Sequence, residues 1–214
     1  MKDIELVNIW KSYDQKLDEV LSLNKEIVFE LTKEKISKTI RTMRRPKKVI
    51  LLIGIPYTLF LYLLTFIGYN SKGIFVMFGF GSISLIMTAI IIGYFYHIYL
   101  INSISSTQEI FDVQKKISEL KISSFNVVRL AIIQIPFWSI CWMSLDAFKK
   151  SPIIYGGVNL IVLLVLIYLS YWLYKSLNPR YTNSKVRKFF LSGTEWEPIK
   201  KACEILEQLK DIRK

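Results

Sequence analysis

The sequence has few of the residues from which proteins build disulfide frameworks, metal sites and catalytic centres. Its 214 residues include two cysteines and one histidine. Two cysteines do not make a disulfide framework, and a single histidine leaves no His-rich metal site. The short motifs of phosphate-binding loops, serine hydrolases and zinc hydrolases are also absent. The sequence therefore predicts a protein that is not an enzyme, with no catalytic residue, no metal and no cofactor.

Charged residues are missing from four long stretches, although the whole chain carries 29 Lys+Arg and 17 Asp+Glu. The uncharged stretches are Val49–Ser71, Gly73–Gln108, Leu130–Leu145 and Ser151–Tyr174. Uncharged runs of this length are typical of helices that cross a hydrocarbon layer of roughly 30 Å. They exclude an ordinary soluble enzyme domain, a disordered chain and a secreted disulfide scaffold.

From these runs we predict an all-α fold, a four-helix transmembrane bundle with cytoplasmic amphipathic helices. The expected divisions are a cytoplasmic N-terminal amphipathic helix at 1–48, a membrane domain at 49–174 and a cytoplasmic tail at 175–214. The spans are expected at about 49–69, 74–101, 127–148 and 152–174, with a cytoplasmic loop helix at 106–125 and a tail helix at about 195–213.

Basic residues concentrate on alternate sides of the predicted spans, and the densest group precedes the first span. The positive-inside rule then places both termini and the middle loop in the cytoplasm. We expect the dense group to contact lipid headgroups rather than nucleic acid, because it is held against the membrane and lacks interleaved aromatic residues. Its members are Arg41, Arg44, Arg45, Lys47 and Lys48.

Apolar residues recur with heptad spacing through the N-terminal helix. This seam consists of Leu6, Trp10, Tyr13, Leu17, Val20, Asn24, Ile27 and Leu31, at successive spacings of four and three residues. Asn24 takes a core position, where a buried amide can fix the register or the number of partners. Two interpretations stay open: the seam packs on other helices of its own chain, or it binds a cytoplasmic protein or a second copy of the chain.

Two further amphipathic helices are expected on the cytoplasmic side. The middle loop has a capping box, Ser106 with Glu109, followed by an apolar stripe. The tail has the corresponding pair, Thr194 with Glu197, before its own stripe. The loop stripe is Ile110, Val113, Ile117 and Leu120, and the tail stripe is Ile199, Ala202, Cys203, Leu206 and Leu209. The simplest arrangement packs these helices together as a small domain beneath the membrane bundle.

Inside the membrane the sequence offers polar side chains for packing but no ionisable group at mid-depth. Pro136 lacks an N–H and leaves an upstream carbonyl free, which the Gln134 side chain can serve unless it bridges to another helix. Asn159 is the expected partner across the bundle. His97 is expected as an ordinary polar residue near the cytoplasmic interface. Glycines such as Gly79 are expected to let helices approach closely.

Four short stretches, spread along most of the chain, resemble a group of small bacterial four-span integral membrane proteins with no established activity. The stretches are Ile9-Trp10 with Asp14-Gln15-Lys16-Leu17, Gln114-Lys115-Lys116-Ile117, Gln134-Ile135-Pro136-Phe137-Trp138 and Ser192-Gly193-Thr194-Glu195-Trp196. The resemblance implies a bacterial protein of the inner (cytoplasmic) membrane with four spans. It implies no catalytic or binding residue.

These observations lead to two functional hypotheses. The first is a non-enzymatic membrane scaffold or regulator that presents a cytoplasmic helical surface to a protein partner, of which a membrane-tethered anti-sigma-type regulator is one version. The second is an oligomeric channel or a transport accessory subunit, in which the seam holds the oligomer together. The expected partners are the lipid bilayer and a cytoplasmic protein or a second copy, with no nucleic acid and no metal.

Overall fold

The computed structural model describes residues 2–71, 73–105, 109–177 and 196–213, and all regular secondary structure in these ranges is helical. The predicted all-α fold is confirmed. The helices are α1 (Lys2–Arg41), α2 (Arg44–Asn70), α3 (Ile74–Ser103), α4 (Ile110–Ile133), α5 (Ile135–Ile140), α6 (Leu145–Lys150), α7 (Pro152–Ser176) and α9 (Glu197–Arg213).

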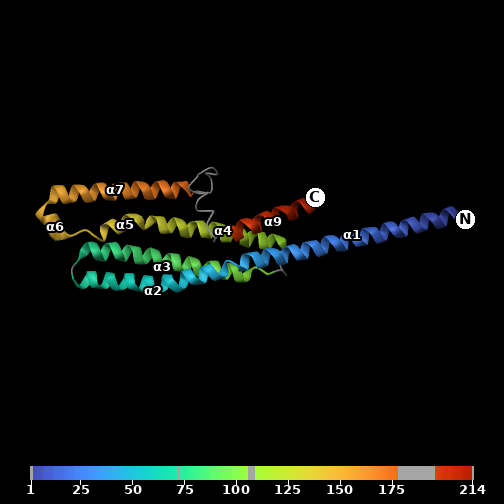
Figure 1. Ribbon diagram of the computed structural model, residues 1–214, viewed down its shortest axis with the longest axis horizontal. Helices are drawn as coiled ribbons and strands as arrows, with labels where there is room; N and C mark the ends of the chain where they lie inside the picture. The colour runs from blue at the N-terminus through green and yellow to red at the C-terminus, as the bar shows by residue number, and fades with distance from the viewer. Residues whose placement is uncertain (1, 72, 106–108, 178–195, 214) are drawn as a thin grey trace.

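The molecule is elongated (Figure 1). By composition it has an apolar half and a polar half. The apolar half contains α2, α5, α7 and the adjoining parts of α3 and α4. In the described part of the chain, four helical segments are long and apolar enough to cross a membrane, and they lie within Tyr13–Asn70, Ile74–Ser103, Phe111–Ile140 and Pro152–Ser176. Ser170 is the single buried residue of α7, so most of this apolar helix faces outward, as a lipid-facing helix does.

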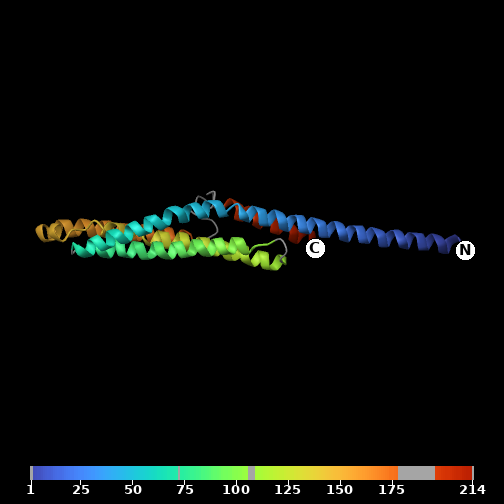
Figure 2. The ribbon, with the colours of Figure 1, turned by 90° about the horizontal axis from the view of Figure 1, so that it is seen from below.

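The N-terminal helix bends where it enters the apolar half. α1 ends at Arg41 and α2 begins at Arg44. Pro46 cannot donate a backbone hydrogen bond to the carbonyl four residues before it, which interrupts the helix at Thr42 and Met43. Figure 2 shows the resulting change of direction. The projecting part of α1 and α9 both lie at the polar end, where the two termini are found (Figure 1).

The loop helix and the third span are one continuous helix, which corrects the predicted division near residue 126. α4 runs from Ile110 to Ile133, because no glycine or proline interrupts this segment. After a turn at Gln134 the chain continues as α5, and α6 starts separately with the Ser144 hydroxyl accepting a hydrogen bond from the Ala147 N–H at 3.4 Å. Ser106 and Thr194, the predicted caps, lie outside the described residues.

The polar half has its own hydrophobic core. The apolar stripes of α4 and α9 pack on the end of α1 and the end of α3, as the sequence predicted for the loop and tail helices. The Phe125 and Trp196 rings pack with their centroids 4.5 Å apart. The buried members are Ile36, Ile40, Met43, Leu100, Ile101, Ile104, Val113, Ile117, Leu120, Phe125, Trp196, Ile199, Ala202 and Leu206.

A smaller core in the apolar half forms around Leu61, Ile83 and Cys141. It depends on the close approach of α3 to the end of α5, which Gly79 permits. A Cβ at position 79 would lie 2.6 Å from the Cys141 Sγ and 2.8 Å from its backbone nitrogen. The predicted role of Gly79 in helix approach is therefore confirmed. A Cβ at Gly157 would meet nothing within 4 Å, so that glycine has no such role.

Candidate functional site

The candidate site is the N-terminal seam, which is exposed along its described length. Its apolar side chains between Trp10 and Leu31 are 48–66% exposed, and Asn24 is exposed as well. The Leu6 side chain lies outside the described residues. The interpretation in which the seam packs against α4 and α9 is wrong for residues 10–31, because the structure leaves those side chains uncovered.

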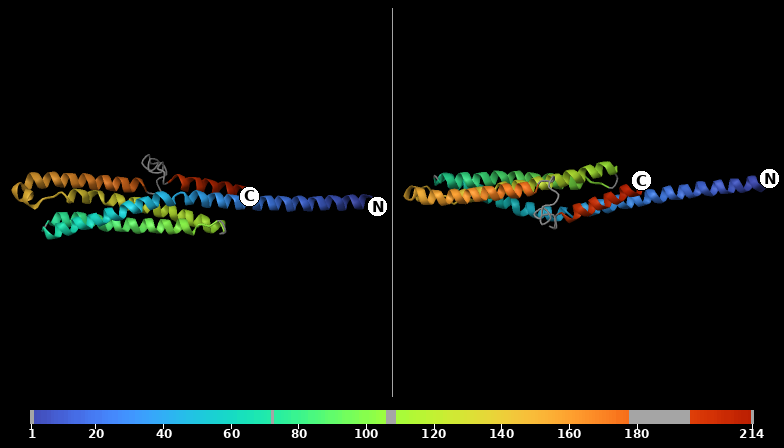
Figure 3. Two further views of the ribbon diagram at one scale, coloured as in Figure 1. Left: turned by 60° about the horizontal axis from the view of Figure 1, so that its bottom comes forward. Right: turned by 90° about the horizontal axis from the view of Figure 1, so that it is seen from above.

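Helix geometry explains why the seam is not covered while the next turns of α1 are. The last seam residue, Leu31, and the first fully buried residue, Ile36, are five positions apart. Five residues rotate the helix by about 140° beyond a full turn, so the buried stripe lies on a different face from the seam. α9 lies alongside the buried part of α1 (Figure 3), and α1 continues past it towards the N-terminus.

The exposed apolar face is wider than a strict heptad seam. Leu21 and Val28 are 50% and 44% exposed, and each directly follows a seam residue. Together they give the spacing of three apolar positions per heptad that is typical of a helix packing in a bundle or groove rather than in a narrow two-stranded seam. Around this face, residues 1–30 carry seven acidic and four basic side chains.

The predicted headgroup cluster divides into an exposed group and one buried lysine. Arg41, Arg44, Arg45 and Lys48 are exposed, as the prediction requires, but the prediction for Lys47 is wrong. Lys47 is 1% exposed and its Nζ lies 3.2 Å from the His97 Nδ1. It also lies 5.0 Å from the centre of the Tyr94 ring. Lys47 is four residues after the buried Met43, so it continues the inward stripe of α1 into α2.

His97 joins Lys47 to α4 in a buried polar chain. Its Nε2 lies 2.9 Å from the Ser123 Oγ. A protonated Lys47 ammonium can only donate, so the His97 Nδ1 then accepts the hydrogen bond from Nζ, and the Nε2–H donates to the Ser123 hydroxyl. The chain Lys47–His97–Ser123 thus joins α2, α3 and α4.

The intramembrane polar contacts differ from those predicted. The Ile132 carbonyl, which Pro136 cannot pair, accepts a hydrogen bond from the Ser170 hydroxyl of α7 at 2.8 Å. Gln134 does not fill this role, and its Oε1 is buried without a hydrogen-bond partner in the described part of the chain. The Asn159 Nδ2 donates to the Tyr155 carbonyl of its own helix at 2.8 Å. The structure therefore corrects the predicted pairing of Gln134 with Asn159.

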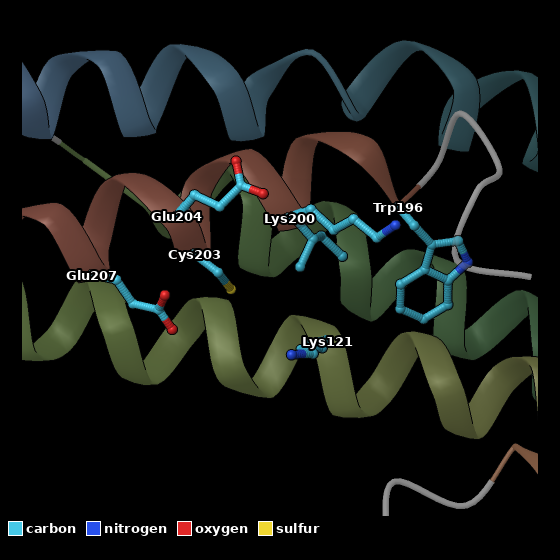
Figure 4. Close-up of a pocket in the computed structure, with 7 residues that line it drawn as sticks. Lys121, Trp196, Lys200, Cys203, Glu204 and Glu207 are labelled. Carbon is cyan, nitrogen blue, oxygen red and sulfur yellow. The ribbon is translucent and has the colours of Figure 1, made fainter. Parts of the chain in front are cut away.

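Two hollows accompany these features. The first, of about 200 Å³, lies between α4 and α9 (Figure 4). It is smaller than the roughly 300–1,000 Å³ of ordinary small-molecule sites. Burial raises the pKa of the Cys203 thiol beside it; Lys121 acts in the opposite direction, and Glu207 and Glu204 raise the pKa further. In Figure 4, Cys203 and Glu207 reach from α9 towards the side of α4 that carries Lys121.

The second hollow is an apolar groove of about 490 Å³ between α4–α5 and α7. It is lined by Ile133, Pro136, Phe137, Ile140, Leu163, Ile167, Ser170, Tyr171 and Tyr174. No group of three His, Cys, Asp or Glu residues that can hold a metal ion occurs in the described ranges.

The chain was compared with family models, with curated proteins and with solved structures, and none of them matches it. The resemblance to bacterial four-span proteins therefore stays a prediction.

Sequence reasoning missed three features, and one of them had a usable signal. The spacing Ile36, Ile40, Met43 continues by four residues to Lys47, which predicts an inward lysine. The partnership of Ser170 with Ile132 had no such signal, because it depends on the alignment of two helices far apart in sequence. The stacking of Arg129 on Tyr174, with Cζ 5.1 Å from the ring centre, depends on the same alignment.

Proposed function

We propose that the protein is a non-enzymatic membrane scaffold or regulator that presents the exposed seam of α1 to a cytoplasmic protein partner. The observation that carries the proposal is the exposure of the apolar seam residues on a helix that projects past the rest of the molecule (Figure 1). An anionic bilayer surface disfavours contact with this face, because residues 1–30 carry seven acidic and four basic side chains and most basic residues follow later.

The size of the exposed face supports a protein partner. A contiguous apolar surface on a soluble segment marks an interaction site, because water solvates it poorly. Full burial of one Leu, Val or Ile side chain contributes about 1.5–3 kcal/mol, so a partner that covers several seam residues gains substantial binding free energy.

The rest of the molecule fits the role of an anchor. The core formed by α1, α3, α4 and α9 fixes the base of the projecting helix to the membrane bundle. The chain Lys47–His97–Ser123 ties α2, α3 and α4 together at the same level. A partner bound to the seam would therefore be held at a defined distance from the inner face of the membrane.

A pair of matched variants tests the proposal in native membranes. Leu17→Glu with Val20→Glu places two charges in the seam, whereas Gln15→Glu with Ser22→Glu places two charges on the opposite, exposed face. After crosslinking and purification, we expect a distinct polypeptide with the unaltered protein and with the control, and its loss from the seam variant. Both variants should stay in the carbonate-resistant membrane fraction.

Either of two results would contradict the proposal. One is an undiminished partner in the seam variant. The other is crosslinking of the chain to copies of itself alone, which would assign the seam to self-association and would favour the channel hypothesis if ion flux accompanied a symmetric ring.

A further inference from the structure

We propose that the apolar groove between α4–α5 and α7 binds one anionic phospholipid of the surrounding bilayer, with an acyl chain in the groove and the phosphate at Arg129. This site is separate from the α1 seam. It does not depend on the proposed function.

The groove has the shape and lining that an acyl chain requires. Its two walls consist of side chains at helical spacing, Ile133 to Ile140 on α4–α5 and Leu163 to Tyr174 on α7. The wall on α7 covers eleven residue steps, or about 16 Å along the helix. The lining is almost entirely apolar, and the volume of about 490 Å³ falls within the range of ligand sites.

Local sequence explains why a groove forms here. The turn at Gln134 and the missing N–H of Pro136 separate α4 from α5, so the side-chain rows do not continue in register. At the same level the Ser170 hydroxyl binds the freed Ile132 carbonyl and holds α7 against α4. This hydrogen bond joins the two walls at the level of the helix break.

Arg129 supplies a cation at the end of the groove nearest the polar half. It lies one helical turn before Ile133, and its Cζ is 5.1 Å from the centre of the Tyr174 ring, which lines the groove. Its Nε and Nη2 are buried and have no hydrogen-bond partner in the described part of the chain. Burying a cation without a counter-ion is costly, so this arrangement calls for an anion.

Among the described helices, the uncharged runs of α2, α3 and α7 contain no carboxylate, and the nearest acidic residue before Arg129 on α4 is Glu119, about 15 Å away along the helix. On α9, Glu197 is paired with Lys201 at 2.7 Å. A lipid phosphate can accept a charge-assisted hydrogen bond from the guanidinium. The exposed Lys175, which follows Tyr174 in α7, favours a headgroup with net negative charge over a zwitterionic one.

The test measures retention of phosphatidylglycerol against phosphatidylcholine by native mass spectrometry of the full-length protein released from nanodiscs containing both lipids. We expect one phosphatidylglycerol to be retained. Its retention should fall tenfold or more in Arg129→Gln and recover in part in Arg129→Lys. Lys115→Gln, which removes an exposed basic residue of α4 outside the groove, is the matched control and should retain the lipid.

A second variant separates the groove from the charge. Ile167→Trp fills the groove and leaves Arg129 in place, so it should also lose the lipid, and it decides the question if Arg129→Gln does not fold. Equal retention of both lipids by the unaltered protein would overturn the proposal. So would unchanged retention in a folded Arg129→Gln or in Ile167→Trp, or a dimer without lipid whose interface occupies the groove.

Discussion

Ser170 illustrates how one hydroxyl compensates for a proline inside a membrane helix. Pro136 leaves the Ile132 carbonyl without its helical donor, and unpaired carbonyls are costly where water is absent. The hydrogen bond from Ser170 pairs that carbonyl and at the same time joins α7 to α4. The carbonyl that Pro136 leaves unpaired in one helix thus accepts a hydrogen bond from another helix.

Removing this hydroxyl should weaken the bundle. We expect Ser170→Ala to lower the free energy of unfolding by about 1 kcal/mol, the scale of interhelical hydrogen bonds in membranes. Denaturation in mixed micelles, followed by tryptophan fluorescence, would measure the change. Ser139→Ala is the matched control, because the Ser139 hydroxyl donates to the Pro136 carbonyl of its own helix. An equal loss in both variants would contradict the role assigned to Ser170.

Lys47 and Lys48 are neighbours in sequence with opposite surroundings. Lys47→Met removes the donor to the His97 Nδ1 and should lower the free energy of unfolding by about 1–3 kcal/mol, since a buried polar group loses its partner. Lys48→Met alters an exposed position and should change the free energy of unfolding by less than about 0.5 kcal/mol. Thermal unfolding in detergent compares the two. Equal stabilities would show that Lys47 is not buried against His97.

The Cys203 thiol should react slowly at neutral pH, because burial raises its pKa and the thiolate is the reactive form. The pH profile of alkylation, resolved by peptide mass spectrometry, should rise at higher pH than for the same cysteine in the unfolded chain. Glu207→Gln should lower the pKa and Lys121→Gln should raise it. A profile that both variants leave unchanged would contradict the arrangement in Figure 4.

At the scale of helices, Gly79 and Gly157 both lie within apolar helices but differ in what surrounds them. Gly79→Ala would place a Cβ 2.8 Å from the Cys141 backbone nitrogen, so α3 and α5 would have to separate. We expect a loss of about 1–3 kcal/mol, the usual range for overpacking. Gly157→Ala adds a methyl group to open space and should be neutral or slightly stabilising. The prediction would be wrong if the two variants unfolded at the same denaturant concentration.

The helices themselves could be predicted from the sequence because their signals are local. Uncharged runs located the membrane segments, and the apolar stripes of α4 and α9 identified residues such as Ile117 and Ile199 that the structure buries together. The residues at which helices end were harder to predict. α4 continues through residue 126 because no helix-breaking residue occurs there, and such an absence gives no positive signal in the sequence. Whether the α1 seam is buried or exposed could not be predicted, because packing within the chain and binding of a partner both use the same heptad spacing.

Contacts across the bundle could not be predicted, because they depend on the relative rotation and height of helices distant in sequence. Gln134 and Asn159 are both polar and both lie in apolar runs, yet Ser170 makes the contact with the freed carbonyl. The burial of Lys47 follows from a periodicity that continues across the bend at Pro46, where a helix break would ordinarily end it.

At the scale of the whole molecule, the distribution of apolar surface divides the chain into three parts. The apolar half exposes hydrophobic side chains along helices that are long enough to span a bilayer. The polar half buries its stripes in a core of its own. The projecting part of α1 differs from both, because it exposes apolar residues among charged residues, of which more are acidic than basic. The proposed function follows from this third part.

Disulfide and photo-crosslinking from single cysteines at positions 13 to 31, in native membranes, tests that account most directly. We expect efficient crosslinks to another polypeptide at Leu17, Val20, Ile27 and Leu31, and weak ones at positions on the opposite face such as Gln15 and Ser22. Crosslinks confined to α4 or α9 of the same chain, or an efficiency that does not follow the seam, would contradict it.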